Sequence, residues 1–417
     1  MSNDLFLGLD FGTSGARALV IDANENILAQ AHCSYDITTW QSWLHALGWL
    51  FATLPAPVRH RIGAIAIDGT SSTVLLCDET NTPLQAPQLY NDQATEAALR
   101  IADIAPPGHT ASAPTSSLAK LLHLLAQSHA HTPTYFADQA SWLASMLTGK
   151  PGYSDYNNAL KLGYDVTHLT WPEWIRPLCI TSYLPHIVAP GTPLGTVTPE
   201  VASFLDISPN CAVRAGTTDS IAAFLASGAN KVGDAVTSLG STLVLKLLSS
   251  QKVDDGRYGI YSHRLGMRWL AGGASNSGGA ALSQFFDPHT LATLSEQIDV
   301  TRSSGLDYYP LPKTGERFPI NDPYLTPRFS PRPASDVTFL HGMLEGIARI
   351  EAQGYALLAE LGAPPLNRVL TAGGGANNEA WRVIREKLLG VPISPAPHLE
   401  AAFGAARLAL FGDKLLS

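Results

Sequence analysis

The sequence repeats one local design at two distant places. Residues 5–9 form an apolar run that ends at Asp10, and the turn at 12–15 leads into a second apolar run at 18–22. Residues 236–245 again have the pattern of strand, Gly-Ser-Thr turn and strand. Glycines in such turns let backbone N–H groups approach phosphate oxygens, and the hydroxyls add donors. Each hairpin alone could be an ordinary turn, but the pair predicts two related domains that face one nucleotide.

A third glycine-rich element lies near the C-terminus. Residues 373–378 (Gly-Gly-Gly-Ala-Asn-Asn) follow a short strand-like run at 369–372 and precede a helical stretch at 379–389. Such a junction allows close backbone approach, and the helix N-terminus favours negative or polar groups of a ligand. A tight turn between a strand and a helix is the alternative. The three elements in order favour nucleotide binding.

Composition and charge narrow the class of protein. The 417 residues suffice for two domains with full cores, and 45% hydrophobic with 15% charged residues is typical of a globular chain. The formal net charge of -8 argues against nucleic acid or an anionic membrane as the main partner. Phosphate binding remains compatible with this charge, because loops bind phosphate through backbone dipoles.

Cysteine spacing and the N-terminal sequence predict the compartment. No two cysteines form a CxxC pair, so neither a zinc site nor a disulfide framework is indicated. Scattered cysteines of this kind are typical of a reduced compartment. No signal peptide is visible, and no apolar run reaches the ~18 residues of a membrane span. We therefore expect a soluble cytoplasmic enzyme without a membrane partner.

Strand-like and helix-like segments alternate along the chain, which predicts an α/β fold. A glycine-flanked stretch at 228–233 has the character of a crossing between two domains. Beyond it we expect a helix at 277–286 and a long one at 336–361, with a Pro- and Arg-rich connection between them. The last helix, from 400, is expected to return to the N-terminal domain.

Several segments together resemble the FGGY family of carbohydrate kinases over essentially the whole chain. They are residues 9–14, 154–159 (after Leu-Thr-Gly), 215–220, 315–319 and 373–378. The resemblance implies two actin-like (ribonuclease H-like) domains with a nucleotide and sugar cleft between them. It implies a sugar-binding domain at 1–227, completed by the helix at 400–417, and a nucleotide-binding domain at 228–399. ATP and Mg²⁺ are the implied cofactors.

Residues 68–76 are similar to a narrower group, the short cyanobacterial and plant kinases assigned to D-ribulose. The resemblance implies phosphorylation of D-ribulose to D-ribulose 5-phosphate. Two positions depart from the family pattern. The usual Trp-x-Asp-x-Arg appears as Tyr-Asn-Asp-Gln-Ala at 90–94, without the arginine, and His123 replaces the aromatic residue expected after Lys120.

The resemblance implies roles for four polar residues. Asp219 is the general base for the sugar hydroxyl, although Asp at the start of a helix is more often a cap. Asp10 binds either a sugar hydroxyl or Mg²⁺ through water. Ser71 and Asp92 are further ligands for sugar hydroxyls, and their alternatives are a turn serine and a capping aspartate.

The remaining candidate residues would bind ATP. Gly12 and Thr13 would face the transferred phosphoryl group from one side, and Gly240, Ser241 and Thr242 from the other. Adenine and ribose would be framed by Gly374, Gly375 and Asn378, with Trp381 either against the ring or inside the core. Since dipolar loops and Mg²⁺ carry the charge, no basic phosphate clamp is required.

Alternative functions differ in acceptor or in class. D-Xylulose or another ketose or polyol is an alternative acceptor. A sugar- or nucleotide-sensing regulator with a kinase fold would lack turnover, which an intact Asp219 argues against. An actin-like filament or chaperone ATPase would share the phosphate hairpins, but segments such as 154–159 and 315–319 are not expected in it.

Overall fold

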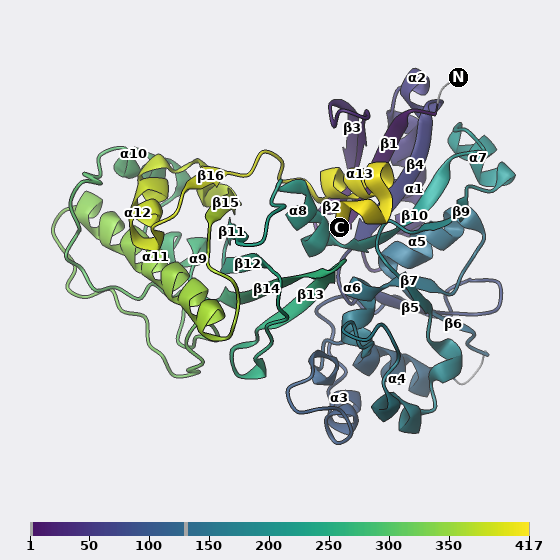
Figure 1. The fold of residues 1–417 in the computed structure, drawn as a ribbon, viewed down its shortest axis with the longest axis horizontal. Coiled ribbons are helices and arrows are strands. Elements are labelled where there is room, and N and C mark those ends of the chain that lie inside the picture. Colours follow the sequence, from purple (N-terminus) through teal and green to yellow (C-terminus); the bar gives the residue numbers. More distant parts are fainter. Residues whose placement is uncertain (1–2, 129–131, 417) are drawn as a thin grey trace. The chain divides into compact units, whose positions relative to one another are not determined.

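The structure is a computed structural model that describes residues 3–128 and 132–416. The chain divides into two compact units (Figure 1). The first lies within Met1–Ala226 and Glu400–Ser417, and the second is Ser227–Leu399. The C-terminal segment therefore belongs with the N-terminal part of the chain.

A six-stranded sheet forms the centre of the first unit. In spatial order its strands are β3 (Ile27–Cys33), β2 (Gly15–Ile21), β1 (Leu5–Gly12), β4 (Ile62–Gly69), β10 (Ala212–Thr218) and β9 (Pro193–Thr196). The hairpin of β1 and β2 is antiparallel, whereas β1, β4 and β10 run parallel to one another. Strands β1 and β4 are largely apolar on both faces, which is typical of strands covered from both sides.

The helices around this sheet are α1 (Trp40–Thr53), α2 (Ala56–Arg59), α5 (Gln139–Thr148), α7 (Pro199–Leu205), α8 (Asp219–Ala226) and α13 (Ala401–Phe411). A subregion inserted between β4 and β10 adds β5 (Val74–Cys77), α3 (Thr95–Ala102), α4 (Ser117–Gln127), β6 (Tyr135–Asp138), β7 (Tyr153–Asp155), α6 (Tyr156–Ala159) and β8 (His186–Val188). Strands β5 and β6 pair with each other, as do β7 and β8.

Small residues allow α13 to pack directly on the backbone of the first unit. A side chain at Gly8 of β1 would meet the carbonyl oxygen of Ala402 at 1.9 Å, and one at Gly404 would meet that of Ala222 in α8 at 1.8 Å. Because these glycines face backbone atoms, the contact leaves no room for a methyl group. The last helix thus completes the core beneath β1 and α8.

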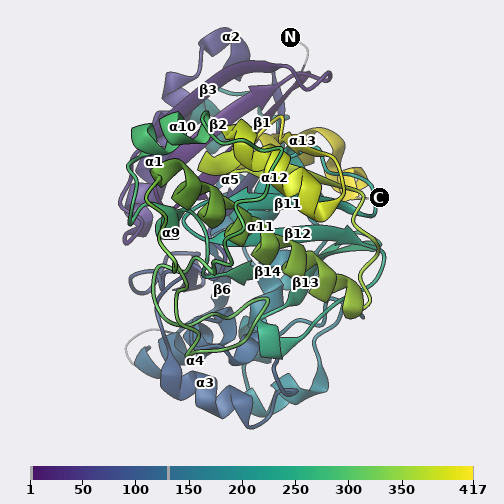
Figure 2. The same ribbon diagram turned by 90° about the vertical axis from the view of Figure 1, so that its left-hand side faces the viewer.

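The second unit repeats the arrangement of sheet and helices. Its sheet contains β13 (Tyr261–Leu265), β14 (Arg268–Ser275), β12 (Leu243–Ser249), β11 (Asp234–Leu239), β15 (Arg368–Ala372) and β16 (Ile393–Pro395) in spatial order. Its helices are α9 (Gly279–Leu282), α10 (Pro288–Ser295), α11 (Asp336–Glu360) and α12 (Glu379–Leu389). Figure 2 shows α11 running across the strands of this sheet, against β12 and β14.

Short 3₁₀ helices complete the two units: Thr110–Ser112, Leu160–Leu162, Glu173–Leu178, Thr181–Tyr183, Gly256–Tyr258, Gly374–Asn377 and Gly412–Leu416. Within the described residues, no helix combines the length and apolar character needed to cross a membrane.

The expected helix at 277–286 is wrong in length. Only Gly279–Leu282 is α-helical, because Gly278 has an extended positive φ of 142° at one end and the Asp287 cap of α10 follows soon after the other. The long helix at 336–361 is confirmed as α11 to within one residue.

Two helical glycines provide a test of the backbone packing. Gly404→Ala should destabilise the protein by about 1–3 kcal/mol or more, since the added carbon overlaps the Ala222 carbonyl. Gly48→Ala in α1 is the matched control. Its added carbon would lie 3.7 Å from the ring of Phe204, so a gain of roughly 0.5–1 kcal/mol is expected. Urea unfolding of both variants checks this, and equal stabilities would contradict the packing.

Candidate functional site

Three aspartates meet at one edge of the sheet in the first unit. Asp10 on β1 lies opposite Asp68 on β4 in the parallel register, and Thr217 on β10 lies opposite Asp68 on its other side. Helix α8 begins at Asp219, directly after β10. Parallel strands end at the same edge of a sheet, and this edge is where α/β proteins bind ligands. The topology therefore gathers these carboxyl groups.

Asp10 and Asp68 share a buried environment. Their exposed fractions are 5% and 0%. No N–H or O–H donor of the described residues reaches either carboxyl oxygen of Asp68. Because no such donor offsets the cost of burial, the protonated, uncharged form of Asp68 is favoured.

Burial and neighbouring charge set the acidity of the pair. Burial raises the pKa of Asp10, the positive charge of Arg17 lowers it and the charge of Asp219 raises it, and the net result is a pKa of about 6. Burial and the charges of Asp10 and Asp219 raise the pKa of Asp68 well above its ordinary value. Arg17 on β2 places Nη1 3.3 Å from Asp10 Oδ2 and Nε 3.2 Å from Glu400 Oε2, which orients the Asp10 carboxylate.

Asp219 is the accessible member of the group. It is partly exposed, and its Oδ1 accepts a hydrogen bond of 2.6 Å from the backbone N–H of Ser220. As the first residue of an eight-residue helix it lies where the helix dipole favours negative charge. A carboxylate so placed can accept a proton from a bound hydroxyl group.

A chain of hydrogen bonds connects the first glycine turn to the next loop. Thr13 is exposed and Gly12 is partly exposed, and the Gly12 carbonyl accepts a 2.8 Å hydrogen bond from the Tyr35 hydroxyl. Gln139 Nε2 donates to that hydroxyl at 3.3 Å, and Gln139 Oε1 accepts from the Thr70 N–H at 3.1 Å. The turn after β1 and the turn after β4 are thereby held in one arrangement.

The loops that carry Ser71 and Asp92 are joined through a buried lysine. Lys120 Nζ of α4 donates to the carbonyl oxygens of Ser72, at 2.8 Å, and of Leu89. Burial lowers the pKa of Lys120 to about 8, although the charge of Asp92 opposes the shift. Asp92 Oδ2 accepts from the Leu89 N–H at 2.7 Å, so this side chain also stabilises its own turn. Ser71 is partly exposed beside this bridge.

Residues 154–159 hold the end of β10 in place through a hydrogen bond. Asn157 Nδ2 donates to Thr217 Oγ1 at 3.1 Å, and the buried Asp155 caps α6 by accepting from the Asn157 N–H at 2.8 Å. Burial, followed by the charge of Asp138, raises the pKa of Asp155 to about 7. This segment therefore holds β10 in position ahead of Asp219.

In the second unit, the turn at 240–242 is braced by backbone contacts. Its first residue, Gly240, accepts a 2.8 Å hydrogen bond from the Gly279 N–H, and Ser241 accepts one of 3.0 Å from Ala280. A side chain at Gly278 would meet the backbone of this turn at 2.8 Å. Ser241 is exposed, while Gly240 and Thr242 are partly exposed. The turn thus presents N–H and hydroxyl groups from a rigid base.

Residues 315–319 support the same region. The buried carboxylate of Glu316 accepts from Ser275 Oγ at 2.5 Å and from the Asn276 N–H at 2.7 Å. Ser275 is the last residue of β14, and Asn276 follows it and leads to the glycines at 278–279. The segment that contributed to the family resemblance therefore has a structural role here.

The loop at 373–375 packs against the turn at 240–242. A side chain at Gly373 (φ 82°) would meet the Leu239 carbonyl oxygen at 2.7 Å, and one at Gly375 would meet the Trp381 ring at the same distance. Gly374 is exposed, with open space around it. Because Leu239 directly precedes Gly240, the two loops lie side by side within this unit.

Trp381 and Asn378 have structural contacts. Trp381 is 3% exposed and packs beneath the glycine loop, so its ring is part of the core in this structure. Asn378 caps α12: its Oδ1 accepts from the Trp381 N–H at 3.0 Å, and its Nδ2 donates to Ser295 Oγ at 2.8 Å. Of the expected base-framing residues, Gly374 and Gly375 are the ones that present accessible backbone.

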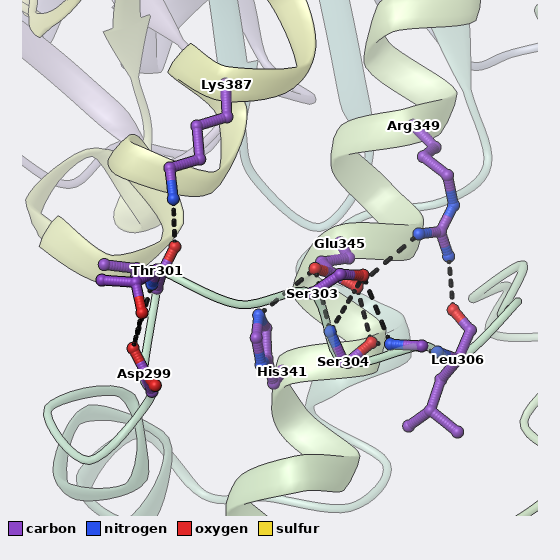
Figure 3. A network of polar contacts seen from close by, with 11 residues as sticks. Asp299, Thr301, Ser303, Ser304, Leu306, His341, Glu345, Arg349 and Lys387 are labelled. Atoms are coloured by element: carbon purple, nitrogen blue, oxygen red, sulfur yellow. Dashed lines mark hydrogen bonds and ion pairs between the residues drawn. The ribbon is translucent and has the colours of Figure 1, made fainter.

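Figure 3 shows how residues 299–306 are fixed to α11. Glu345 Oε2 accepts from Ser304 Oγ at 2.5 Å, and Glu345 Oε1 lies 3.3 Å from His341 Nε2. Burial raises the pKa of Glu345, but hydrogen bonds from His341 and Ser304 outweigh it and bring the pKa to about 2. These contacts hold residues 299–306 against α11.

Several residues of the site were not predicted from the sequence. Asp68, Arg17, Lys120, Tyr35 and Gln139 hold the predicted residues in place. A signal for Asp68 exists, because Asp68-Gly69-Thr70 ends an apolar strand much as Asp10-Phe11-Gly12 does. Lys120 and Gln139 carry no such signal, since only the fold brings them to these loops.

Comparison with known proteins agrees with this architecture. Residues 235–412 match the C-terminal domain of the FGGY family of carbohydrate kinases. The chain is 22% identical over 453 aligned residues to a gluconokinase of Bacillus subtilis (strain 168), covering 97% of this chain and 87% of that one. It is 22% identical to a xylulose kinase of Staphylococcus xylosus, covering 98% and 91%.

Solved structures show the same fold. The crystal structure of a xylulose kinase from Rhodospirillum rubrum superposes with a TM-score of 0.84 at 21% identity, covering 98% of this chain and 89% of that one. The expected fold class, an α/β chain with two actin-like (ribonuclease H-like) domains, is confirmed. At this sequence identity, the comparisons show the fold and do not identify the acceptor.

The raised pKa of Asp10 predicts a gain in stability on removing its charge. A carboxyl group with a raised folded-state pKa loses stability as pH rises from about 4 through about 6. Asp10→Asn should therefore raise the free energy of unfolding by ~1–3 kcal/mol at pH 8 and by much less at pH 4. Asp22→Asn is the control, because hydrogen bonds from Asn26 lower the Asp22 pKa and no gain is expected. An Asp10→Asn protein no more stable than wild type at pH 8 would contradict this account.

Proposed function

We propose that this chain is a carbohydrate kinase of the FGGY family and that it transfers the γ-phosphoryl group of ATP to a hydroxyl of a pentulose, most readily D-ribulose. The class, a phosphotransferase with an alcohol acceptor, rests on the domain match and on the relatives. The acceptor and the residue roles are our proposal. The observation that carries them is the accessible Asp219 beside the buried pair of Asp10 and Asp68.

Asp219 acts as the general base. The hydroxyl oxygen of the sugar forms a bond to the γ-phosphorus while the bond to the bridging oxygen breaks, so ADP leaves. The hydroxyl proton passes to Asp219. Because little covalent chemistry falls to the protein, positioning and charge stabilisation supply most of the acceleration.

The residue pair at the edge of the sheet orients the acceptor. Asp10 accepts a hydrogen bond from a sugar hydroxyl or holds a water bound to Mg²⁺, and Arg17 fixes its carboxylate. Asp68, which is fully buried opposite Asp10 in the parallel register, keeps its proton and so limits like charge beside Asp10. Ser71 and Asp92 bind further hydroxyls of the sugar.

The residues present fit Mg²⁺ that enters with ATP. Within the described residues, no group of three or more His, Cys, Asp or Glu could hold a metal ion alone. Kinases commonly hold Mg²⁺ with one or two carboxylates and the phosphates of the nucleotide. Asp10 and Asp219 are close enough to interact electrostatically and would supply those carboxylates. When bound, Mg²⁺ neutralises charge on the transferring phosphoryl group.

We assign the sugar to residues 1–227 with the helix at 400–417, and the nucleotide to residues 228–399. The turn with Gly12 and Thr13 contacts the phosphoryl group, as does the turn with Gly240, Ser241 and Thr242. The loop with Gly374 and Gly375 contacts adenosine. Asn378 shapes that loop through its cap.

The names of the relatives and one segment of the sequence bear on the identity of the acceptor. Two relatives, both from Staphylococcus, are named xylulose kinase, which makes D-xylulose the second candidate. The similarity of residues 68–76 to ribulose-assigned kinases favours D-ribulose.

The cysteines are all free, which together with ATP as donor favours a cytoplasmic location.

Replacement of the base tests the mechanism. Asp219→Asn should lower kcat by ~10²–10⁴ while leaving ATP affinity nearly unchanged, because the amide cannot accept the proton. Coupled ADP release and nucleotide titration measure the two effects. Asp103→Asn, an exposed aspartate of the same unit, should keep wild-type kcat. Retention of more than about a tenth of kcat by Asp219→Asn would remove it as the base.

The acceptor is tested by ADP release over D-ribulose, D-xylulose, D-gluconate and glycerol. We expect the highest kcat/KM for D-ribulose, since an epimer leaves buried polar groups unpaired at ~1–3 kcal/mol each. Ser71→Ala should raise KM for D-ribulose far more than KM for ATP. Equal kcat/KM for both pentuloses would refute the preference, and ATP hydrolysis unaffected by any sugar would favour a sensor.

A further inference from the structure

We propose that a pocket within the second unit binds the anionic group of a small carboxylated or phosphorylated metabolite. The cavity measures about 220 Å³, and all of its lining residues lie between Val244 and Arg317. The lining residues that matter here are Lys246, Tyr258, Tyr261, His263, Gly272 and Arg317. None of them belongs to the glycine loops assigned to ATP.

The hollow arises from a missing side chain in the sheet. Lys246 on β12 and Tyr261 on β13 both pair with Gly272 on the intervening strand β14. Side chains directly opposite one another in a sheet lie on the same face. Glycine is required at the middle position, because a Cβ there would lie 2.2 Å from the Leu245 carbonyl oxygen. A cleft therefore separates the lysine from the tyrosine.

The pocket lies on the face of the sheet opposite α11. Leu245 contacts Gly354 of α11, where an added Cβ would meet the leucine side chain at 2.5 Å. Because side chains alternate along a strand, the neighbouring Val244 and Lys246 point to the other face. The hydrophobic core beneath α11 is thus separate from the pocket.

The chemistry of the lining favours an anion. Lys246 and Arg317 bring positive charge, and His263, 8% exposed, adds a ring whose centroid lies 5.2 Å from that of Tyr261. Among the residues that the structure describes, no Asp or Glu lines the cavity. The nearby Glu316 carboxylate is committed to Ser275 and Asn276. Lysine and arginine at one cavity can form charge-assisted hydrogen bonds to a carboxylate or phosphate.

Size and position define the ligand class. The cavity is smaller than the roughly 300–1,000 Å³ of pockets for drug-sized ligands, so it suits a monosaccharide-sized acid or phosphate ester. Lys246 lies on β12, the strand that leaves the turn at 240–242. An anion held there would contact the same strand that positions this phosphate turn.

The test measures anion binding to the full chain in the presence of saturating ADP, which fills the nucleotide loops. The probes are inorganic phosphate, D-ribulose 5-phosphate and D-gluconate, each titrated by calorimetry into wild type, Lys246→Met and Arg317→Met. Wild type should bind at least one probe, and each variant should weaken that binding tenfold or more. Lys313→Met, an exposed cation outside the cavity, should change it less than twofold.

The outcomes distinguish a carboxylated from a phosphorylated ligand. They also distinguish a failure of this proposal from a failure of the proposed kinase activity. Binding of D-gluconate that is weakened in both variants would identify a carboxylated metabolite as the ligand. Binding of a phosphate probe without turnover would identify a phosphorylated effector. If wild type binds none of the probes, or if Lys246→Met binds them as tightly as wild type, the proposal is overturned. ADP release that depends on D-ribulose measures the proposed kinase activity independently. ADP affinity and urea unfolding verify that each variant is folded.

Discussion

The parallel pairing of β1, β4 and β10 is the constraint on which the site depends. Three strands that end at one edge bring Asp10, Asp68 and the start of α8 together. Burying carboxyl groups of like charge is costly, and the raised pKa values of Asp10 and Asp68 express that cost. The apolar strands and the close packing of α13 supply the stability that offsets it.

The second unit uses the same principle with a different core. Parallel pairing of β11 and β15 brings the turn at 240–242 beside the loop at 373–375. A buried network fixes both strands: Arg385 of α12 donates to Glu351 of α11 at 2.6 Å and to Thr371 at 2.8 Å, while Thr237 donates to Glu351 at 2.6 Å. A paired buried charge is costly to break, so this network holds the loops in one arrangement.

Local sequence patterns predicted the elements but not the contacts between them. The hairpins, the α11 helix and the glycine loop follow from runs of apolar residues and from turn residues, which act over short distances. The placement of Asp68 opposite Asp10 could not be predicted, because it depends on the order and register of strands that are distant in the sequence. The capping role of Asn378 and the burial of Trp381 likewise depend on packing against Ser295 and Gly375.

The central claim is that the first unit binds the sugar and the second binds the nucleotide. Amide hydrogen exchange, followed by mass spectrometry, tests it on the intact chain with each substrate alone. The account predicts that D-ribulose protects the loops at 69–73 and 89–92, and that an unreactive ATP analogue protects 240–242 and 373–378. Protection of the second unit alone by the sugar, with the loops at 69–73 and 89–92 unchanged, would contradict it.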